Sequence, residues 1–248
     1  MSIIVRASLV AFACLSLSST KIQALGKDDL PAIKSSPSNP VPQCATPGRL
    51  MAFLELRNSK LATRYKGIAL DYMRYGESLK VRWDYAFFQM LVETGNLTYT
   101  GDVKPNQNNF AGLAATGNGV RGESFKDISS GVKAHLEHVL MYTGEKIQNP
   151  VAERTRNIQE WGVLTDWQKT FKEPISFGDL AKKWAPTSRG YAKDISSVAL
   201  AFYNGVCKAP DPHPELVAEA RNSINKGVTY AKVESNNPVI EGKGAEIA

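Results

Sequence analysis

The chain has 248 residues, of which 43% are apolar and 22% are charged, and its formal net charge is +6. This length allows one sizeable domain, the apolar content can fill a core, and the charged fraction is ordinary for a globular protein. The basic residues are scattered and form no stripe, which argues against a nucleic-acid partner, although a basic exported protein would be attracted to anionic envelope polymers.

Residues 1–24 have the outline of a signal peptide. Arg6 supplies a positive charge, an uncharged and mostly apolar run follows over residues 7–17, and Ala24 offers a cleavage point. The run is too short to span a bilayer comfortably. We therefore expect export to the periplasm or cell wall, with no stable membrane insertion after cleavage. A retained N-terminal anchor is the alternative.

The next stretch, residues 25–46, is rich in proline and serine, which predicts an extended linker without a core of its own. It carries Cys44, and Cys207 lies near the other end of the predicted domain. Cleavage after Ala24 would remove Cys14 and leave these two, and two cysteines in an oxidising compartment favour one disulfide. The alternative is two unpaired thiols.

Helical signals dominate from there on, and they predict one domain over residues 47–225 followed by a flexible tail over 226–248. Thr46 before Pro47 is typical of a helix start, and Asp84, Ser129-Ser130 and Ser176 are the expected caps of three later helices. The helices are expected at about 47–61, 65–78, 84–92, 132–142, 151–161, 163–171, 177–184, 191–206 and 214–224.

The segment over 84–92 is apolar almost all round, so we expect it at the centre of the domain. Residues 94–128 are instead rich in Gly, Asn and Thr, which predicts a small hairpin or a long loop. A loop of this length inside a compact domain is usually functional or disordered. The pattern predicts a mostly α fold with a small irregular or β insert.

Glu93 stands where the most apolar predicted helix ends, directly before Thr94 and Gly95. Apolar surroundings and the negative end of the helix dipole both disfavour a carboxylate, so the pKa of Glu93 should rise. A glutamic acid that stays protonated near neutral pH can give its proton to a glycosidic leaving oxygen. The alternatives are a buried Glu paired with an Arg, or a Glu that faces solvent.

Three short motifs follow one another in the chain: Glu93-Thr94-Gly95, Asn109-Phe110-Ala111-Gly112 and Tyr191-Ala192. In this order they resemble the glucosaminidase domain of glycoside hydrolase family 73, and the likeness covers about residues 80–205. That family includes bacterial autolysins and flagellar rod-associated peptidoglycan hydrolases. The resemblance implies a lysozyme-like fold, in which a helical lobe and a small β or loop lobe flank a glycan cleft.

The resemblance also implies roles for single residues. Glu93 would be the general acid, and the substrate would be peptidoglycan, cleaved after N-acetylglucosamine. Asn109, Phe110 and Gly112 would belong to the substrate-binding loop, with the amide holding a sugar group and the ring anchoring the loop. The alternatives are a turn residue for Asn109 and a core plug for Phe110.

No motif fixes the second catalytic group. The acids of the loop are Asp102, Glu123 and Asp127, and Glu123 is the preferred base or stabiliser because it is the only glutamate among them. Its alternative is an exposed loop acid. Without a second carboxylate, the N-acetyl group of the substrate could act as the nucleophile, with Tyr191 orienting or stabilising it. Trp184 could close the core behind Tyr191 or stack on a sugar.

His135 and His138 share one helix face, but neither zinc-protease spacing is present and no third ligand is obvious. We therefore expect two solvated histidines beside Glu137 and no metal. No glycine-rich phosphate loop and no Ser or Cys nucleophile signature appears, so we expect no cofactor.

The sequence thus predicts a monomeric, exported peptidoglycan glucosaminidase. One alternative is a muramidase or lytic transglycosylase of the same fold. Another is a catalytically inactive protein of the cell envelope that binds peptidoglycan or serves as a scaffold.

Overall fold

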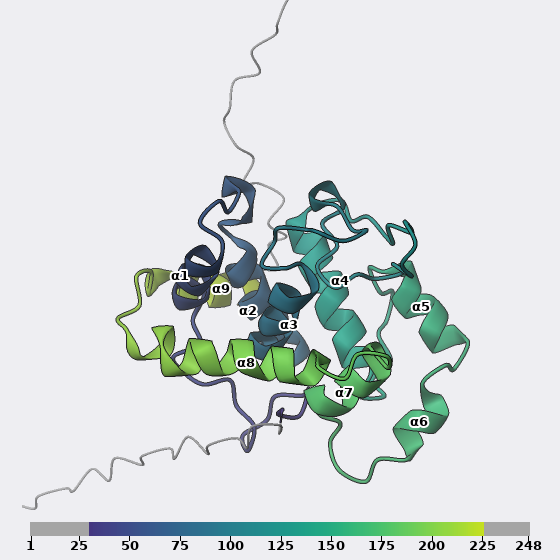
Figure 1. The fold of residues 1–248 in the computed structure, drawn as a ribbon. Coiled ribbons are helices and arrows are strands. Elements are labelled where there is room, and N and C mark those ends of the chain that lie inside the picture. Colours follow the sequence, from purple (N-terminus) through teal and green to yellow (C-terminus); the bar gives the residue numbers. More distant parts are fainter. Residues whose placement is uncertain (1–29, 226–248) are drawn as a thin grey trace, which may run out of the picture.

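The computed structural model describes residues 30–225, so the predicted signal peptide and the predicted C-terminal tail lie outside the described part. This part is mostly helical, as predicted, and its β-structure is limited to isolated bridges (Figure 1). None of its helices is both long and apolar enough to cross a membrane. The α-helices are α1 (Pro47–Arg57), α2 (Ile68–Leu79), α3 (Trp83–Glu93), α4 (Ile128–Met141), α5 (Glu153–Glu160), α6 (Thr165–Lys169), α7 (Phe177–Trp184), α8 (Tyr191–Asn204) and α9 (Glu215–Asn225).

Helix α3 lies at the centre, as its apolar sequence predicts. Every residue from Trp83 to Leu91 is buried, and the helix packs against α2, α4 and α8. Asp84 is not its cap, contrary to expectation. The carboxylate of Asp84 is fully buried and accepts hydrogen bonds from the Arg82 guanidinium at 2.6 and 2.9 Å and from the Tyr203 hydroxyl. The ion pair satisfies a buried charge, and the hydrogen bond from Tyr203 ties α3 to α8.

Two of the predicted helix starts are confirmed. The Thr46 side chain caps α1, and Ser176 caps α7 in a reciprocal capping box with Asp179. The start of α4 differs from the prediction, because the cap is Asp127 and not Ser129-Ser130. The Asp127 carboxylate accepts from the backbone N–H of Ser130 at 2.7 Å.

The stretch from residue 30 to 46 is not a linker. Ile33 is fully buried, and its N–H donates to the carbonyl of Ile175 at 2.9 Å while its carbonyl accepts from Arg82 N–H at 2.8 Å. Phe177 N–H donates to the carbonyl of Pro31 at 2.9 Å. Short antiparallel bridges therefore hold the stretch between the start of α7 and the residues before α3. The composition of this stretch suggested a linker, but its backbone finds hydrogen-bond partners in two distant parts of the chain, around Ile175 and Arg82.

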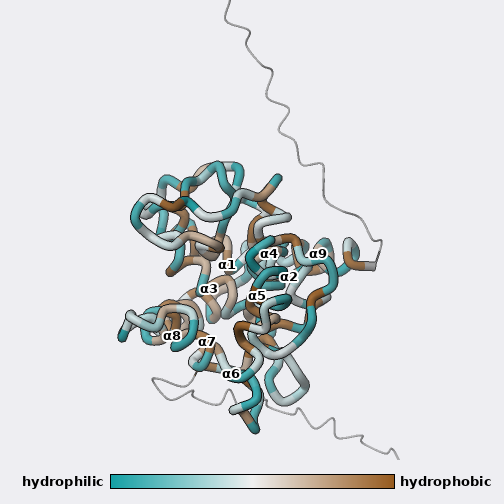
Figure 2. Tube along the Cα trace, turned by 90° about the vertical axis from the view of Figure 1, so that its right-hand side faces the viewer, coloured by the Kyte–Doolittle hydropathy of each residue, from teal (hydrophilic) through white to brown (hydrophobic). Residues whose placement is uncertain are grey.

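The loop between α3 and α4 lies above α7 and α8 in both Figure 1 and the rotated view of Figure 2, where it carries both hydrophilic and hydrophobic stretches. Buried amide side chains shape it. Gln107 Nε2 donates to the carbonyl of Arg121 at 2.9 Å, and Asn108 Nδ2 donates to the carbonyl of Phe125 at 2.9 Å. These bonds replace the ladder of a hairpin, so the lobe predicted as β or loop is a loop.

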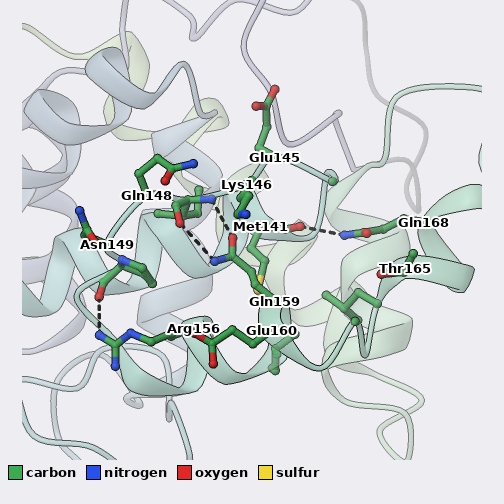
Figure 3. Close-up of a pocket in the computed structure, with 16 residues that line it drawn as sticks. Met141, Glu145, Lys146, Gln148, Asn149, Arg156, Gln159, Glu160, Thr165 and Gln168 are labelled. Carbon is green, nitrogen blue, oxygen red and sulfur yellow. Dashed lines mark hydrogen bonds between the residues drawn. The ribbon is translucent and has the colours of Figure 1, made fainter.

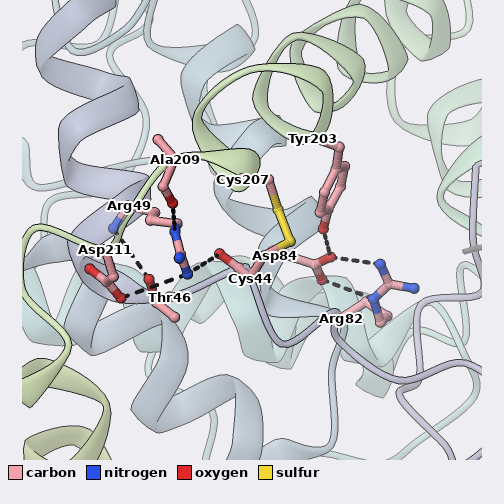
Figure 4. Close-up of a disulfide and its surroundings, with 9 residues drawn as sticks. All are labelled: Cys44, Thr46, Arg49, Arg82, Asp84, Tyr203, Cys207, Ala209 and Asp211. Atoms are coloured by element: carbon pink, nitrogen blue, oxygen red, sulfur yellow. Dashed lines mark hydrogen bonds and ion pairs between the residues drawn. A yellow bond between two sulfur atoms is a disulfide. The ribbon is translucent and has the colours of Figure 1, made fainter. Parts of the chain in front are cut away.

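A disulfide joins Cys44, before α1, to Cys207, after α8, across a sequence separation of 163 residues. Figure 4 shows it beside the Arg82–Asp84 pair and beside Arg49, whose guanidinium donates to the carbonyl of Ala209 at 2.9 Å. The disulfide and the Arg49 hydrogen bond thus join the segment around the start of α1 to the segment after α8.

The disulfide should contribute strongly to stability, because it restricts a long loop of the unfolded chain. The Cys44→Ala/Cys207→Ala variant is expected to lose up to about 5 kcal/mol of unfolding free energy, as the chain-entropy account gives for so long a loop. Urea unfolding with and without a reductant measures this. Reductant should lower the midpoint of the wild type and leave that of the double variant unchanged; an unchanged wild-type midpoint would contradict the role.

Candidate active site

A cleft of about 390 Å³ lies at the C-terminal end of α3, between the loop after α3 and the junction of α7 with α8. One carboxyl group reaches it from a helix and another from the loop. The lining residues are Glu93, Tyr99, Gly101, Asp102, Val103, Ala111, Gly112, Ala115, Trp184, Ala185 and Tyr191.

Glu93 is the last residue of α3 and is partly buried. Burial raises the pKa of its carboxyl group to about 7, while hydrogen bonds from Tyr191 and Trp184 oppose the rise. The Tyr191 hydroxyl donates to Glu93 Oε1. Among the ion pairs of residues 30–225, none includes Glu93. Glu93 is therefore neither clamped by an arginine nor simply solvated, and it can hold a proton near neutral pH.

The second oxygen of Glu93 faces Gly112 across the cleft. Gly112 has φ +60°, a left-handed conformation that favours glycine, and a Cβ there would lie 3.5 Å from Glu93 Oε2. The loop thus approaches the carboxyl group closely without covering it. Gly112 lies at the site, as predicted.

Tyr191 and Trp184 also lie at the site. Tyr191 begins α8, is 7% exposed and lines the cleft. Trp184 ends α7 and hydrogen-bonds to Glu93 with one edge, while its ring packs against His138 and Tyr142 with centroids 5.4 and 5.8 Å away. Trp184 therefore packs its ring against the core and also borders the cleft, while its stacking on a sugar stays a prediction.

Glu123 is held elsewhere. Both of its carboxylate oxygens accept backbone N–H groups at the start of α5, from Glu153 at 2.9 Å and from Arg154 at 2.7 Å. It caps a helix whose own N-cap residue, Ala152, has no side-chain oxygen. Glu123 is not among the lining residues. Glu123 is therefore held away from the cleft, and Asp102 is the acid of the loop that lines it.

Asn109 and Phe110 hold the loop rather than facing the cleft. Asn109 is 1% exposed; its Nδ2 donates to the carbonyls of Leu113 and Glu123 at 2.9 and 3.0 Å, and its Oδ1 accepts from Leu113 N–H at 2.9 Å. With these bonds made, the amide cannot also hold a sugar, and that prediction is wrong. Phe110 is 1% exposed and packs on Tyr65. It therefore fills the core, as its alternative role predicted.

His135 and His138 are buried, so the prediction of solvated histidines is wrong. They are 0% and 4% exposed, and burial lowers the pKa of each to about 3. His138 Nδ1 hydrogen-bonds to Thr155 Oγ1 at 2.8 Å. Within residues 30–225 no group of acidic, His and Cys side chains could hold a metal ion. Periodicity placed both histidines on one face but did not reveal that this face meets α3 and α7.

Gln89 was not singled out from the sequence. It lies one turn before Glu93 in α3, is fully buried, and its Nε2 donates to the Tyr191 hydroxyl at 2.9 Å. The sequence did contain a sign of its importance. Gln89 is the only amide side chain in the apolar run before Glu93, and a spacing of four residues places both on one face of the helix.

A second cavity, of about 520 Å³, lies between the end of α4, α5 and α6 (Figure 3). It is larger than the cleft, but its central amides serve the backbone. Gln159 exchanges hydrogen bonds with the main chain of Ile147 at 2.7 and 3.2 Å, and Gln168 donates to the carbonyl of Met141 at 2.8 Å. We regard it as a structural hollow, because these bonds fix the connection from α4 to α5.

The raised pKa of Glu93 predicts a pH-dependent cost to stability. The native state keeps a proton that the unfolded state, with a pKa near 4.5, releases first. Relative to Glu93→Gln, which keeps every other titrating group, the wild type should therefore lose stability as the pH rises from about 4.5 through 7. The variant should gain roughly 1–3 kcal/mol over the wild type in this window, after discounting for partial exposure. Urea unfolding at several pH values measures the gap.

Glu55→Gln, an exposed acid of α1, is the matched control and should show no such widening. A gap for Glu93→Gln that stays constant from pH 4 to 8 would mean that Glu93 ionises as in the unfolded chain.

Comparisons with known proteins place the chain in a family. No solved structure matches the chain. An uncharacterized protein of Borreliella burgdorferi (strain ATCC 35210 / DSM 4680 / CIP 102532 / B31) is 42% identical over 133 residues, which are 52% of this chain and 59% of that protein. The glucosaminidase family, described as mannosyl-glycoprotein endo-beta-N-acetylglucosaminidase, matches residues 69–204, more than half of the chain. The chain therefore belongs to the glucosaminidase family of glycoside hydrolases.

Proposed function

We propose that the protein is an exported peptidoglycan hydrolase that cleaves the β-1,4 bond after N-acetylglucosamine, with Glu93 as the general acid. The observation that carries this proposal is a carboxyl group with a pKa of about 7 in the wall of a cleft. Membership of the glucosaminidase family supports the class of bond and the substrate.

The contacts of Glu93 support both halves of a proton transfer. Burial favours the neutral acid before the reaction, when a proton is needed. Once the proton has moved to the glycosidic oxygen, the carboxylate that remains keeps its hydrogen bonds from Tyr191 and Trp184. Hydrogen bonds to an ion are stronger than those to a neutral acid. They therefore stabilise the charge as it develops on Glu93.

Asp102 is the second carboxyl group of the proposed site. It shares the cleft with Glu93 and comes from the opposite, loop side. In that place a carboxylate could activate a water molecule, act as nucleophile or stabilise the positive charge that develops on the sugar. If Asp102 proves dispensable, the N-acetyl group of the substrate takes the role of nucleophile and Tyr191 orients it.

The disulfide between Cys44 and Cys207 supports export, because such bonds persist in oxidising compartments. We propose the periplasm or the cell wall as the place of action. The predicted signal peptide over residues 1–24 would direct the chain there.

Glu93→Gln should strongly slow the cleavage of purified sacculi, because the variant keeps the shape of the side chain but has no acidic proton to give. We expect the rate to fall by roughly 10²–10⁴-fold, the usual contribution of a general acid. Chromatography of the products should reveal new reducing-end N-acetylglucosamine in the wild-type digest. Reducing-end or anhydro N-acetylmuramic acid would instead indicate a muramidase or a lytic transglycosylase.

The controls separate chemistry from binding. Glu93→Gln should still sediment with sacculi, and Glu123→Gln should keep its product pattern because its carboxylate serves α5. Asp102→Asn should be slowed if the loop acid takes part, and should remain near wild type if the substrate's N-acetyl group does its work. A wild type that binds sacculi and releases nothing would leave only a binding or scaffold protein.

A further inference from the structure

A chain of hydrogen bonds runs from Glu93 into the core and joins four helices. The Tyr191 hydroxyl of α8 contacts Glu93, and Gln89 Nε2 of α3 contacts Tyr191 Oη at 2.9 Å. Gln89 Oε1 then meets His135 Nε2 of α4 at 3.3 Å, and His135 Nδ1 meets Tyr72 Oη of α2 at 2.7 Å. Tyr72, Gln89 and His135 are fully buried. We name these five side chains the relay.

The hydrogen bonds of the relay can run in only two directions, either all toward Glu93 or all away from it. Burial lowers the pKa of His135 to about 3, so the ring is neutral and has one nitrogen that donates and one that accepts. If the neutral His135 donates through Nε2, Gln89 Oε1 accepts from it. Gln89 Nε2 then donates to Tyr191, and the Tyr191 hydroxyl donates to Glu93. A His135 that donates through Nδ1 reverses each bond, so that Gln89 Oε1 accepts from Tyr191 and Glu93 must donate to Tyr191.

The remote end of the relay selects the direction. The hydroxyl of Tyr72 has one hydrogen-bond partner within residues 30–225, His135 Nδ1. If Tyr72 accepted a hydrogen bond from that nitrogen, its own hydrogen would be buried without an acceptor, which is costly. Tyr72 therefore donates to Nδ1, and Nε2 of His135 carries the hydrogen. It follows that Gln89 donates to Tyr191, and that Tyr191 donates to Glu93 Oε1.

This direction decides which oxygen of Glu93 holds the acid proton. Oε1 accepts from Tyr191, so the proton is on Oε2, and Oε2 is the oxygen that faces Gly112 in the cleft. With the relay reversed, the proton would lie on Oε1 and point at Tyr191 instead of a substrate.

We propose that Tyr72, His135 and Gln89 are positioning residues that hold Tyr191 as a donor to Glu93 and thereby keep the acid proton on the oxygen that faces the cleft. This inference rests on the proposed function of Glu93. It extends the machinery of the site from the lining residues to a layer of buried side chains, none of which can touch a substrate.

The hydrogen position on His135 is the direct test. In the full chain labelled with ¹⁵N-histidine, long-range ¹H–¹⁵N correlation spectra distinguish the two neutral tautomers, and His135→Gln identifies the signals. We expect a neutral ring with its hydrogen on Nε2 from pH 5 to 8. A hydrogen on Nδ1, or a ring that becomes protonated in that range, would overturn the proposal. This readout does not depend on enzymatic activity.

The kinetic test removes one bond of the relay at a time. Gln89→Met keeps the bulk of the side chain and deletes the donor to Tyr191, so on soluble glycan strands kcat should fall about 10-fold or more while KM stays unchanged, because the cleft lining is intact. Tyr72→Phe keeps its ring and deletes only the remote hydroxyl, and it should lower kcat by a smaller factor. It is also the variant to rely on if Gln89→Met does not fold.

Thr155→Val is the matched control. It deletes the buried hydrogen bond of the other α4 histidine, His138, which lies outside the relay. It should cost a similar amount of thermal stability and leave kcat within about twofold of wild type. If Gln89→Met and Tyr72→Phe behave like Thr155→Val in kcat, the relay is only structural and the proposal fails. A wild type without activity would remove the proposed function, while the nitrogen signals would still decide the direction of the relay.

Discussion

The chemistry of the cleft depends on one buried carboxyl group that is held between opposing influences. Burial at the end of α3 raises the pKa of Glu93 to about 7, while Tyr191 and Trp184 offer hydrogen bonds that favour the charged form. A fully apolar pocket would keep the proton too firmly, and an arginine partner would remove it. Held between these limits, the group can release a proton near neutral pH and tolerate the charge that remains.

The rest of the fold keeps this balance in place. The buried helix α3 carries Gln89 and Glu93 on one side, and α8 supplies Tyr191 from a segment about one hundred residues further along the chain. The disulfide fastens the end of α8 to the segment before α1. The loop across the cleft is fixed by its own buried amides, including Asn109, so its glycine can approach the acid closely. The contacts that stabilise the fold are therefore also the contacts that hold Glu93 and Tyr191 in place.

Much of this was predictable from the sequence, and the failures have physical causes. Apolar periodicity found the helices, and the position of Glu93 at the end of the most apolar one predicted its raised pKa. Glu123 was preferred over Asp102 because of its residue type, but the uncapped start of α5 takes its carboxylate. The segment around Ile33 seemed a linker because its hydrogen-bond partners lie far away in the chain. Local patterns could not indicate that His135 meets Gln89.

The ionisation of Glu93 is the property that decides whether it can act as a proton donor. In ¹³C-labelled protein, the side-chain carboxyl signal that disappears in Glu93→Gln can be followed by NMR from pH 3 to 9. We expect a titration midpoint near pH 7. A midpoint near 4.5, the ordinary value for a glutamic acid, would show that the group is already charged at neutral pH and cannot serve as the proton donor.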